Sequence, residues 1–162
     1  MNISKEMEKA FNSQIQKEIE SSYLYLSMST WFDSEDLPGF AHWMRKQAAE
    51  ETEHAMKMVS FVTERSGRVI LEAIPAPKSS WKTPMDVLKE TLGHEQMVTK
   101  RIYDMVNLAA KEGDLASASY LDWFVKEQVE EEASANEIIA VLKKVGDSQV
   151  GLYTLDRHLN AR

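Results

Sequence analysis

The chain has 162 residues, 43% hydrophobic and 28% charged, which is typical of one globular domain and not of a disordered segment. A net charge of −7 argues against nucleic-acid binding, and the absence of cysteine excludes disulfides and cysteine-ligated metal sites. The N-terminal residues lack the apolar run of a signal peptide, and no segment approaches the ~18 apolar residues of a membrane span, so we expect a cytoplasmic protein with no membrane partner.

Helix-forming residues dominate the first half of the chain. The first helix is predicted to follow a cap at Ser4 and to end at about Phe32. In the turn DSEDLPG, Asp36 is the expected cap of a second helix and Pro38 lies near its first position. This second helix is predicted to end at about Arg65, where Ser-Gly follows.

The second half begins with an extended connection over residues 66–83, which are rich in proline and β-branched side chains. A third helix is expected over about 84–111 and, after a tight turn, a fourth over about 115–145. The segment 148–159 has leucines on one side but is too short to be a stable helix alone, so we expect it to dock on the other helices.

The connections predict the topology. Short turns make the first two helices antiparallel, and likewise the last two long ones. The connection over 66–83 could span ~60 Å when extended, more than the ~42 Å length of such a helix. The expected fold is therefore all-α: one domain over 1–162, a four-helix bundle with one long crossover and a short fifth C-terminal helix.

Each long helix has a seam of mostly apolar or small residues at alternating steps of three and four, and an acid interrupts each seam near its middle. The seam of the first helix is read as Phe11, Ile15, Glu18, Ser22, Tyr25, Ser29 and Phe32. Glu18 and Glu51 are equally distant from the turn between them, as are Glu95 and Gln128 from theirs. Residues equidistant from an antiparallel turn lie at the same level, so each pair should meet.

His54 and Glu131 lie on the same faces one turn further on, three residues after Glu51 and Gln128. Four buried glutamates would each cost several kcal/mol unless they are protonated, paired or bound to metal. The seams offer no Lys or Arg, whereas two divalent cations would balance four carboxylates. Carboxylates with one imidazole suit Fe²⁺ or Mn²⁺ and, with less discrimination, Zn²⁺.

Simpler interpretations compete with a metal site. A lone Glu-x-x-His is most often surface charge, Tyr25 is most simply a core residue, and His94 lies off the seams and should face solvent or a neighbour. The segment 126–135 is a charged face by default, although Glu127 and Glu130 flank the seam pair and could hold a further cation. Two other functions stay open: a di-iron or di-manganese oxidoreductase, which needs a substrate cavity beside the metals, and a metal-free scaffold with protonated acids.

Five stretches of the chain are distinctive when taken together: QIQKEIESSYLYLSMS, GFAHWMRKQAAEETEHAMKM, GHEQMVTKRIYD, WFVKEQVEEEASA and GLYTLDRHL. With them the chain resembles the prokaryotic non-haem ferritins over nearly its whole length. The resemblance implies a single ferritin-like domain that stores iron and oxidises Fe(II) with O₂ or H₂O₂ at a di-iron ferroxidase centre within each subunit. It also implies that 24 identical subunits form a shell around the Fe(III) mineral.

The resemblance implies two iron ions per subunit, bridged by Glu51. The residues carried over to the first iron site are Glu18, Glu51 and His54. Those of the second are Glu51, Glu95 and Glu131, with Gln128 close by. A third site beside Glu131 would use Glu50, Glu127 and Glu130. Tyr25 matches a tyrosine next to the centre and is a candidate electron donor.

The chain also departs from related families. Thr52 stands where haem-binding bacterioferritins place a methionine, and Gln128 and Glu131 stand in place of their Glu-x-x-His pair, so we expect no haem. Rubrerythrins add a CxxC module, which a cysteine-free chain cannot form. Ala118 and Leu121 stand at the acidic pore positions of animal ferritins, which leaves the route of iron entry open.

Overall fold

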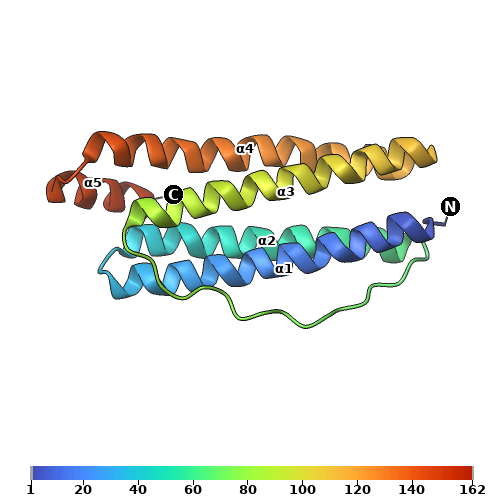
Figure 1. Ribbon diagram of the computed structural model, residues 1–162, viewed down its shortest axis with the longest axis horizontal. Coiled ribbons are helices and arrows are strands. Elements are labelled where there is room, and N and C mark those ends of the chain that lie inside the picture. The colour runs from blue at the N-terminus through green and yellow to red at the C-terminus, as the bar shows by residue number, and fades with distance from the viewer. Residues whose placement is uncertain (1, 162) are drawn as a thin grey trace.

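The computed structural model describes residues 2–161, and this part of the chain forms five helices. Four are long and lie side by side, and one is short (Figure 1): Lys5–Ser34 (α1), Pro38–Glu64 (α2), Pro84–Glu112 (α3), Leu115–Val145 (α4) and Gln149–Leu159 (α5). α1 packs antiparallel to α2, and α3 to α4, while α1 and α3 join the two pairs. The predicted all-α bundle with a short fifth helix is confirmed. Within residues 2–161, no helix combines the length and apolar character needed to cross a membrane.

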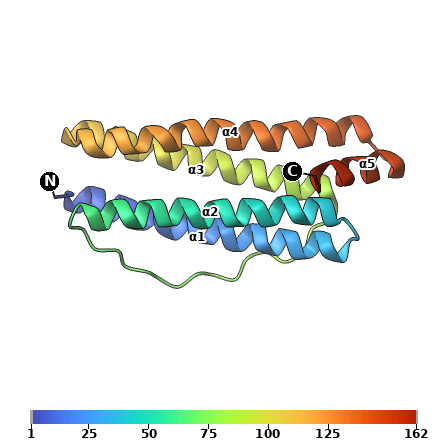
Figure 2. The ribbon, with the colours of Figure 1, turned by 180° about the vertical axis from the view of Figure 1, so that it is seen from behind.

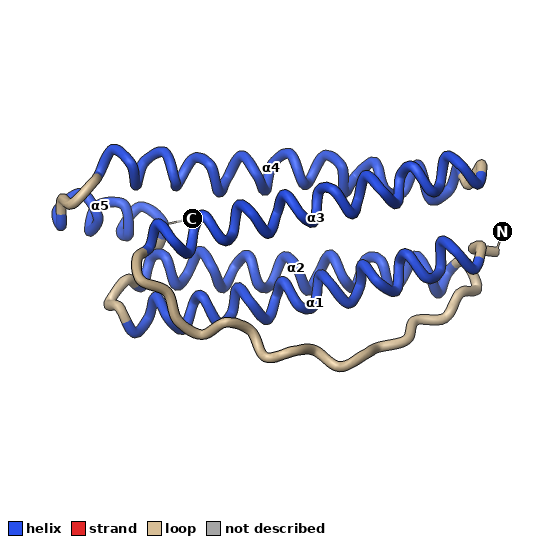
Figure 3. Tube along the Cα trace, viewed as in Figure 1, coloured by secondary structure: helices blue, strands red, loops and turns tan. Residues whose placement is uncertain are grey.

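The connection between α2 and α3 follows the bundle from one end to the other, beside α1 (Figures 1 and 2), and is irregular along its length (Figure 3). Polar side chains of α1 hold it in place. The Asn12 side chain donates to the Arg68 carbonyl (2.9 Å) and accepts from the Ile70 amide (2.7 Å), and Gln16 donates to the Ala73 carbonyl (3.1 Å). α2 and α3 therefore run parallel, and the predicted long crossover is confirmed.

The helix boundaries agree closely with the sequence predictions, with one correction at the start of α2. Ser4 caps α1 as predicted, because its Oγ accepts from the Met7 amide (3.0 Å). Asp36 was expected to cap α2, and that prediction is wrong. Asp36 adopts a left-handed turn conformation (φ 57°), and the N-cap position falls on Leu37, whose side chain makes no capping hydrogen bond.

The cap of α2 comes from α5. Asp156 Oδ1 accepts from the amides of Gly39 (2.8 Å) and Phe40 (3.0 Å), two of the donors that a helix start leaves without partners. The helices touch here: a Cβ on Gly39 would lie 1.7 Å from the Asp156 carbonyl oxygen, so only glycine permits the approach. Leu155 and Leu159 are buried in the same contact. The expected docking of the last segment is confirmed.

Two apolar clusters fill the bundle, with a polar layer between them. Phe32, Phe40 and Leu88 belong to the cluster at the α5 end, and Phe11 and Ile102 belong to the other. The acids predicted near the middle of each seam fall between the clusters. The bundle thus places a water-poor polar layer halfway along four helices.

One seam position needs correction. Ser22 is only half-buried, and Ser21 takes the buried position instead. Ser22 turns toward α2, where its Oγ donates to the Ala48 carbonyl (2.6 Å). The helix period predicts the face of α1 but not which of two adjacent serines reaches the core.

Candidate metal centre

Six predicted site side chains lie in the polar layer, and all four long helices contribute. Their exposed fractions are 1–7%, so they are almost closed off from water: Glu18, Glu51, His54, Glu95, Gln128 and Glu131. The predicted pairing by level is confirmed in the second helix pair, where Gln128 Nε2 donates to the Glu95 main-chain carbonyl (3.2 Å) and to its Oε2 (3.1 Å). Counting residues from the turns therefore located the layer.

The first helix pair brings together Glu18, Glu51 and His54, each of which offers one ligand atom within 4.8 Å of the others. His54 Nδ1 lies 3.6 Å from Glu51 Oε2. Within residues 2–161, no donor reaches Glu18 Oε2 or Glu51 Oε2, although both oxygens are buried. Buried polar atoms are normally paired, so two orphaned carboxylate oxygens beside an imidazole fit a bound cation.

Without a metal ion, the surroundings of Glu51 favour its protonated form. Burial raises the pKa of Glu51 well above its ordinary value, and the nearby charges of Glu18, Glu95 and Glu131 raise it further. Metal ligands must lose their protons, so a cation would bind here in exchange for protons.

Burial moves the pKa values of Glu131 and His54 in opposite directions. Burial raises the pKa of Glu131 to about 8, the charge of Glu95 adds to this, and the hydrogen bond from Gln47 Nε2 to Glu131 Oε2 (2.6 Å) opposes it. Burial lowers the pKa of His54, since desolvation disfavours the charged form of either group. A neutral imidazole is the form that binds a metal ion.

Donors hold both oxygens of Glu95. The Tyr25 hydroxyl donates to Oε1, and the Gln128 amide donates to Oε2. Burial raises the pKa of Glu95, while these two hydrogen bonds oppose the rise. Tyr25 is fully buried, and burial together with the charge of Glu95 raises its pKa well above the ordinary value. The structure thus places Tyr25 directly on a candidate ligand.

A second group of ligand atoms within 4.8 Å consists of His54, Glu127 and Glu131. His54 Nε2 lies 3.9 Å from Glu127 Oε1, and Glu127 is partly exposed. Glu50 and Glu130 lie outside both groups, although their charges raise the pKa of Glu127 after the larger effect of burial. The layer therefore opens toward a more exposed acidic region through Glu127.

Sequence reasoning did not single out the amides that orient these carboxylates. Gln14 Nε2 donates to Glu18 Oε1 (2.9 Å), and Gln47 performs the same role for Glu131. A signal was present for Gln14, which lies one helical turn before Glu18, the acid that it binds. Gln47 lies one turn before Glu51 but binds Glu131 on α4, so the spacing does not reveal its role. His94 was expected to face either solvent or a neighbour, and it contacts a neighbour. Its Nε2 lies 2.6 Å from Ser21 Oγ.

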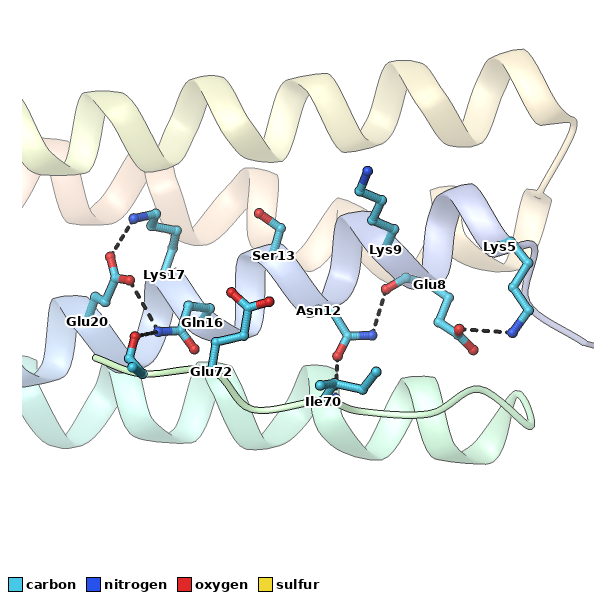
Figure 4. A pocket seen from close by; sticks show the side chains of 11 residues that line it. Lys5, Glu8, Lys9, Asn12, Ser13, Gln16, Lys17, Glu20, Ile70 and Glu72 are labelled. Atoms are coloured by element: carbon cyan, nitrogen blue, oxygen red, sulfur yellow. Dashed lines mark hydrogen bonds and ion pairs between the residues drawn. The ribbon is translucent and has the colours of Figure 1, made fainter. Parts of the chain in front are cut away.

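Surface cavities lie elsewhere. Four cavities of about 200 to 540 Å³ within residues 2–161 are lined by residues other than the candidate ligands. Figure 4 shows one of them, a groove of about 530 Å³ between α1 and the crossover, where Lys5 pairs with Glu8 and Lys17 with Glu20. The substrate cavity that an oxidoreductase acting on organic molecules needs is not among these four.

The bundle and its buried cluster of carboxylates and imidazole define a ferritin-like metal-binding protein. The family described as "Ferritin-like domain" matches residues 8–145. The chain belongs to the ferritin family.

Proteins and solved structures named as ferritins are similar to this chain over nearly its whole length. A "Bacterial non-heme ferritin" of Bacteroides fragilis is 41% identical over 160 residues, which cover 99% of both chains. One from Staphylococcus saprophyticus is 36% identical and aligns over 99% of this chain and 96% of the relative. Among solved structures, an open pore ferritin from the archaeon Archaeoglobus fulgidus is 49% identical, with a TM-score of 0.97 over 99% of this chain and 98% of the other.

Proposed function

We propose that the chain stores iron: it oxidises Fe(II) with O₂ or H₂O₂ at the buried carboxylate cluster and keeps Fe(III) as a mineral inside a shell of identical subunits. The observation that carries the proposal is the pair of buried oxygens on Glu18 and Glu51 beside His54 that no donor reaches in the described part of the chain, residues 2–161. Full-length similarity to proteins named bacterial non-heme ferritin supports the same function.

Iron is the substrate of this site, and we propose that each subunit binds two ions during oxidation. The ligands of the first ion are Glu18, Glu51 and His54, and those of the second are Glu51, Glu95 and Glu131 with Gln128 alongside. The proximity of Glu127 to His54 and Glu131 supports a third site beside the pair, with Glu50 and Glu130 as further acids.

The residues of the layer have separate tasks in this mechanism. Bound iron supplies the electrons that reduce the oxidant. Glu51 lies between the two sites, and its negative charge, with that of Glu18 and Glu131, favours Fe(III) over Fe(II). Glu51 and Glu131 release their protons as the ions bind. Tyr25 holds Glu95 in place through its hydroxyl and is a candidate electron donor.

Haem is not part of the proposed function. Thr52 occupies the position where a thioether ligand would be needed, and its hydroxyl is already engaged. It donates to the Ala48 carbonyl (3.1 Å) and lies 3.0 Å from Ser22 Oγ. A hydroxyl held in this way fits helix packing between α1 and α2 and offers no soft ligand to a haem iron.

We propose a shell of 24 copies of the 18.5 kDa chain, located in the cytoplasm. The net charge of −7 per chain would favour the accumulation of cations around and within such a shell. Size-exclusion chromatography tests the assembly, since a 24-subunit shell elutes far ahead of a monomer or dimer. Elution as a monomer or dimer would contradict it.

The decisive test of the chemistry is Glu51→Ala, with Glu53→Ala as the matched control. Both acids lie on α2, but Glu51 is buried in the cluster and Glu53 is exposed. We expect Glu51→Ala to abolish rapid Fe(II) oxidation, measured by ferric absorbance, while the shell still assembles. Glu53→Ala should oxidise iron like the parent protein. Unchanged oxidation by Glu51→Ala would refute the proposed site.

A further inference from the structure

A chain of hydrogen bonds runs from the surface of α3 to a candidate metal ligand on α1. Arg101 Nε donates to Gln14 Oε1 (2.8 Å), and Gln14 Nε2 donates to Glu18 Oε1 (2.9 Å). Arg101 is further held by Nη2, which donates to the carbonyl (3.2 Å) and to the Oγ (2.9 Å) of Ser13. Gln14 is fully buried, whereas Arg101 lines a surface cavity of about 200 Å³.

The chemistry of arginine decides which way the Gln14 amide points. A guanidinium group has only donors, so the atom of Gln14 that faces Arg101 has to be the amide oxygen. The amide nitrogen must then face Glu18. The opposite orientation would set N–H groups against a cation and the amide oxygen against a carboxylate, and both contacts are repulsive.

This arrangement divides the two oxygens of Glu18 between different tasks. Oε1 accepts from the Gln14 amide, while Oε2 is buried and no donor within residues 2–161 reaches it. One carboxylate oxygen of Glu18 lies within 4.8 Å of ligand atoms of Glu51 and His54, so an oxygen that Gln14 leaves free is available to an ion there. Hydrogen-bonded partners of this kind orient metal ligands, and their loss commonly weakens metal affinity about 10- to 100-fold.

We propose that Arg101 and Gln14 are positioning residues for the first metal site: Arg101 fixes the orientation of the Gln14 amide, which holds Glu18 with one oxygen free to bind the ion. This inference rests on the proposed function. Glu18 is a proposed ligand of the first site alone, so we expect the larger effect there and a smaller one at the site of Glu95 and Glu131, which shares Glu51 and lies within reach of the Glu18 charge.

The test measures binding of Co²⁺ to the metal-free, assembled protein, by calorimetry and by the ligand-field absorption of the bound ion. Arg101→Met keeps the aliphatic contact but removes every donor, and it lies at a surface cavity, so the core stays filled. We expect about tenfold weaker binding and an altered spectrum at the first site, with a smaller change at the second site. Gln14→Leu, which cuts the chain inside the core, should weaken the first site at least as much.

Two further variants separate positioning from packing. Arg101→Lys retains a side chain that only donates, so it should recover most of the affinity that Arg101→Met loses. Arg45→Met is the matched control. Arg45 on α2 also binds α1, where it donates to Ser29 Oγ (3.0 Å) and Asp33 Oδ2 (2.8 Å), and neither of these residues is a candidate ligand. Arg45→Met should bind Co²⁺ like the parent protein.

The outcomes distinguish this inference from the proposed function. If the parent protein binds no Co²⁺ in the cluster, the proposed function fails. If the parent binds but Arg101→Met and Gln14→Leu bind equally well, or if Arg101→Lys is no better than Arg101→Met, the positioning role is refuted while the iron site stands. Equal weakening of both sites would likewise refute it, because that result indicates a general loss of packing.

Discussion

Replacing Glu131 with glutamine should stabilise the metal-free protein while it weakens metal binding. Glu131 is 7% exposed, and its pKa in the folded protein is about 8, against 4.5 ordinarily. Ionisation of Glu131 therefore destabilises the folded protein when no cation is bound. A glutamine has nearly the same shape, carries no charge, and offers an oxygen that can still accept from Gln47.

The magnitude follows from proton linkage. Because the folded protein binds this proton more tightly than the unfolded chain, the stabilisation is fully present below about pH 4.5 and is lost as the pH rises through 8. At 1.36 kcal/mol per pKa unit, the buried carboxyl lowers the free energy of unfolding, relative to its value below pH 4.5, by roughly 3 kcal/mol at pH 7 and by roughly 5 kcal/mol above pH 8. At pH 7 this loss arises because the folded protein keeps a proton that the unfolded chain has released. For a chain of this size, 3 kcal/mol corresponds to roughly 6–12 °C in the melting temperature.

The assay is thermal unfolding of the metal-free protein in chelator between pH 5 and pH 8.5. The parent protein should lose stability across this range, and Glu131→Gln should lose much less and melt higher at pH 8. Glu137→Gln, an exposed position on the same helix, is the matched control and should follow the parent. With Zn²⁺ added, the parent should gain more than Glu131→Gln. Identical pH profiles for the parent and Glu131→Gln would refute the reasoning.

Three further outcomes are expected. Zn²⁺ binding at pH 7 should release close to one proton from Glu131, and the raised pKa of Glu51 should add to the release. Calorimetry in two buffers of different ionisation heat measures the number of protons, and binding without proton release would contradict protonated acids. Asp156→Ala leaves two buried amides at the start of α2 without an acceptor and should lower the free energy of unfolding by about 2–4 kcal/mol. Asp156→Asn keeps an accepting oxygen and should lower it less, and equal losses in the two variants would argue against capping. Gly39→Ala forces α5 away from α2, so amide hydrogen exchange in α5 should accelerate, and unchanged exchange would contradict the close approach.

The level of the polar layer could be predicted because it depends on two simple geometries, the helical period and the antiparallel turn. Glu18 and Glu51 lie the same number of residues from their turn, and so do Glu95 and Gln128, whatever the side chains around them do. Counting residues from a turn determines the relative levels of side chains within one antiparallel helix pair. It does not determine how one helix pair is placed against the other.

The features that escaped prediction depend on contacts between distant segments. Arg101 meets Gln14 through the packing of α1 against α3, which no turn determines. Asp36 has the right residue type for a cap, but the docking of α5 supplies Asp156 instead. Glu127 was predicted to lie beside the cluster, but its approach to His54 on α2 was not, because the spacing of the acids along α4 does not determine which residue of α2 they face.

The most direct test of the central claim is anomalous diffraction at the iron edge from crystals of the metal-free protein soaked anaerobically in Fe²⁺. We expect two iron positions in the polar layer, one coordinated by Glu18, Glu51 and His54 and the other by Glu51, Glu95 and Glu131. Iron bound only at exposed acids, with no anomalous peak between these side chains, would contradict it.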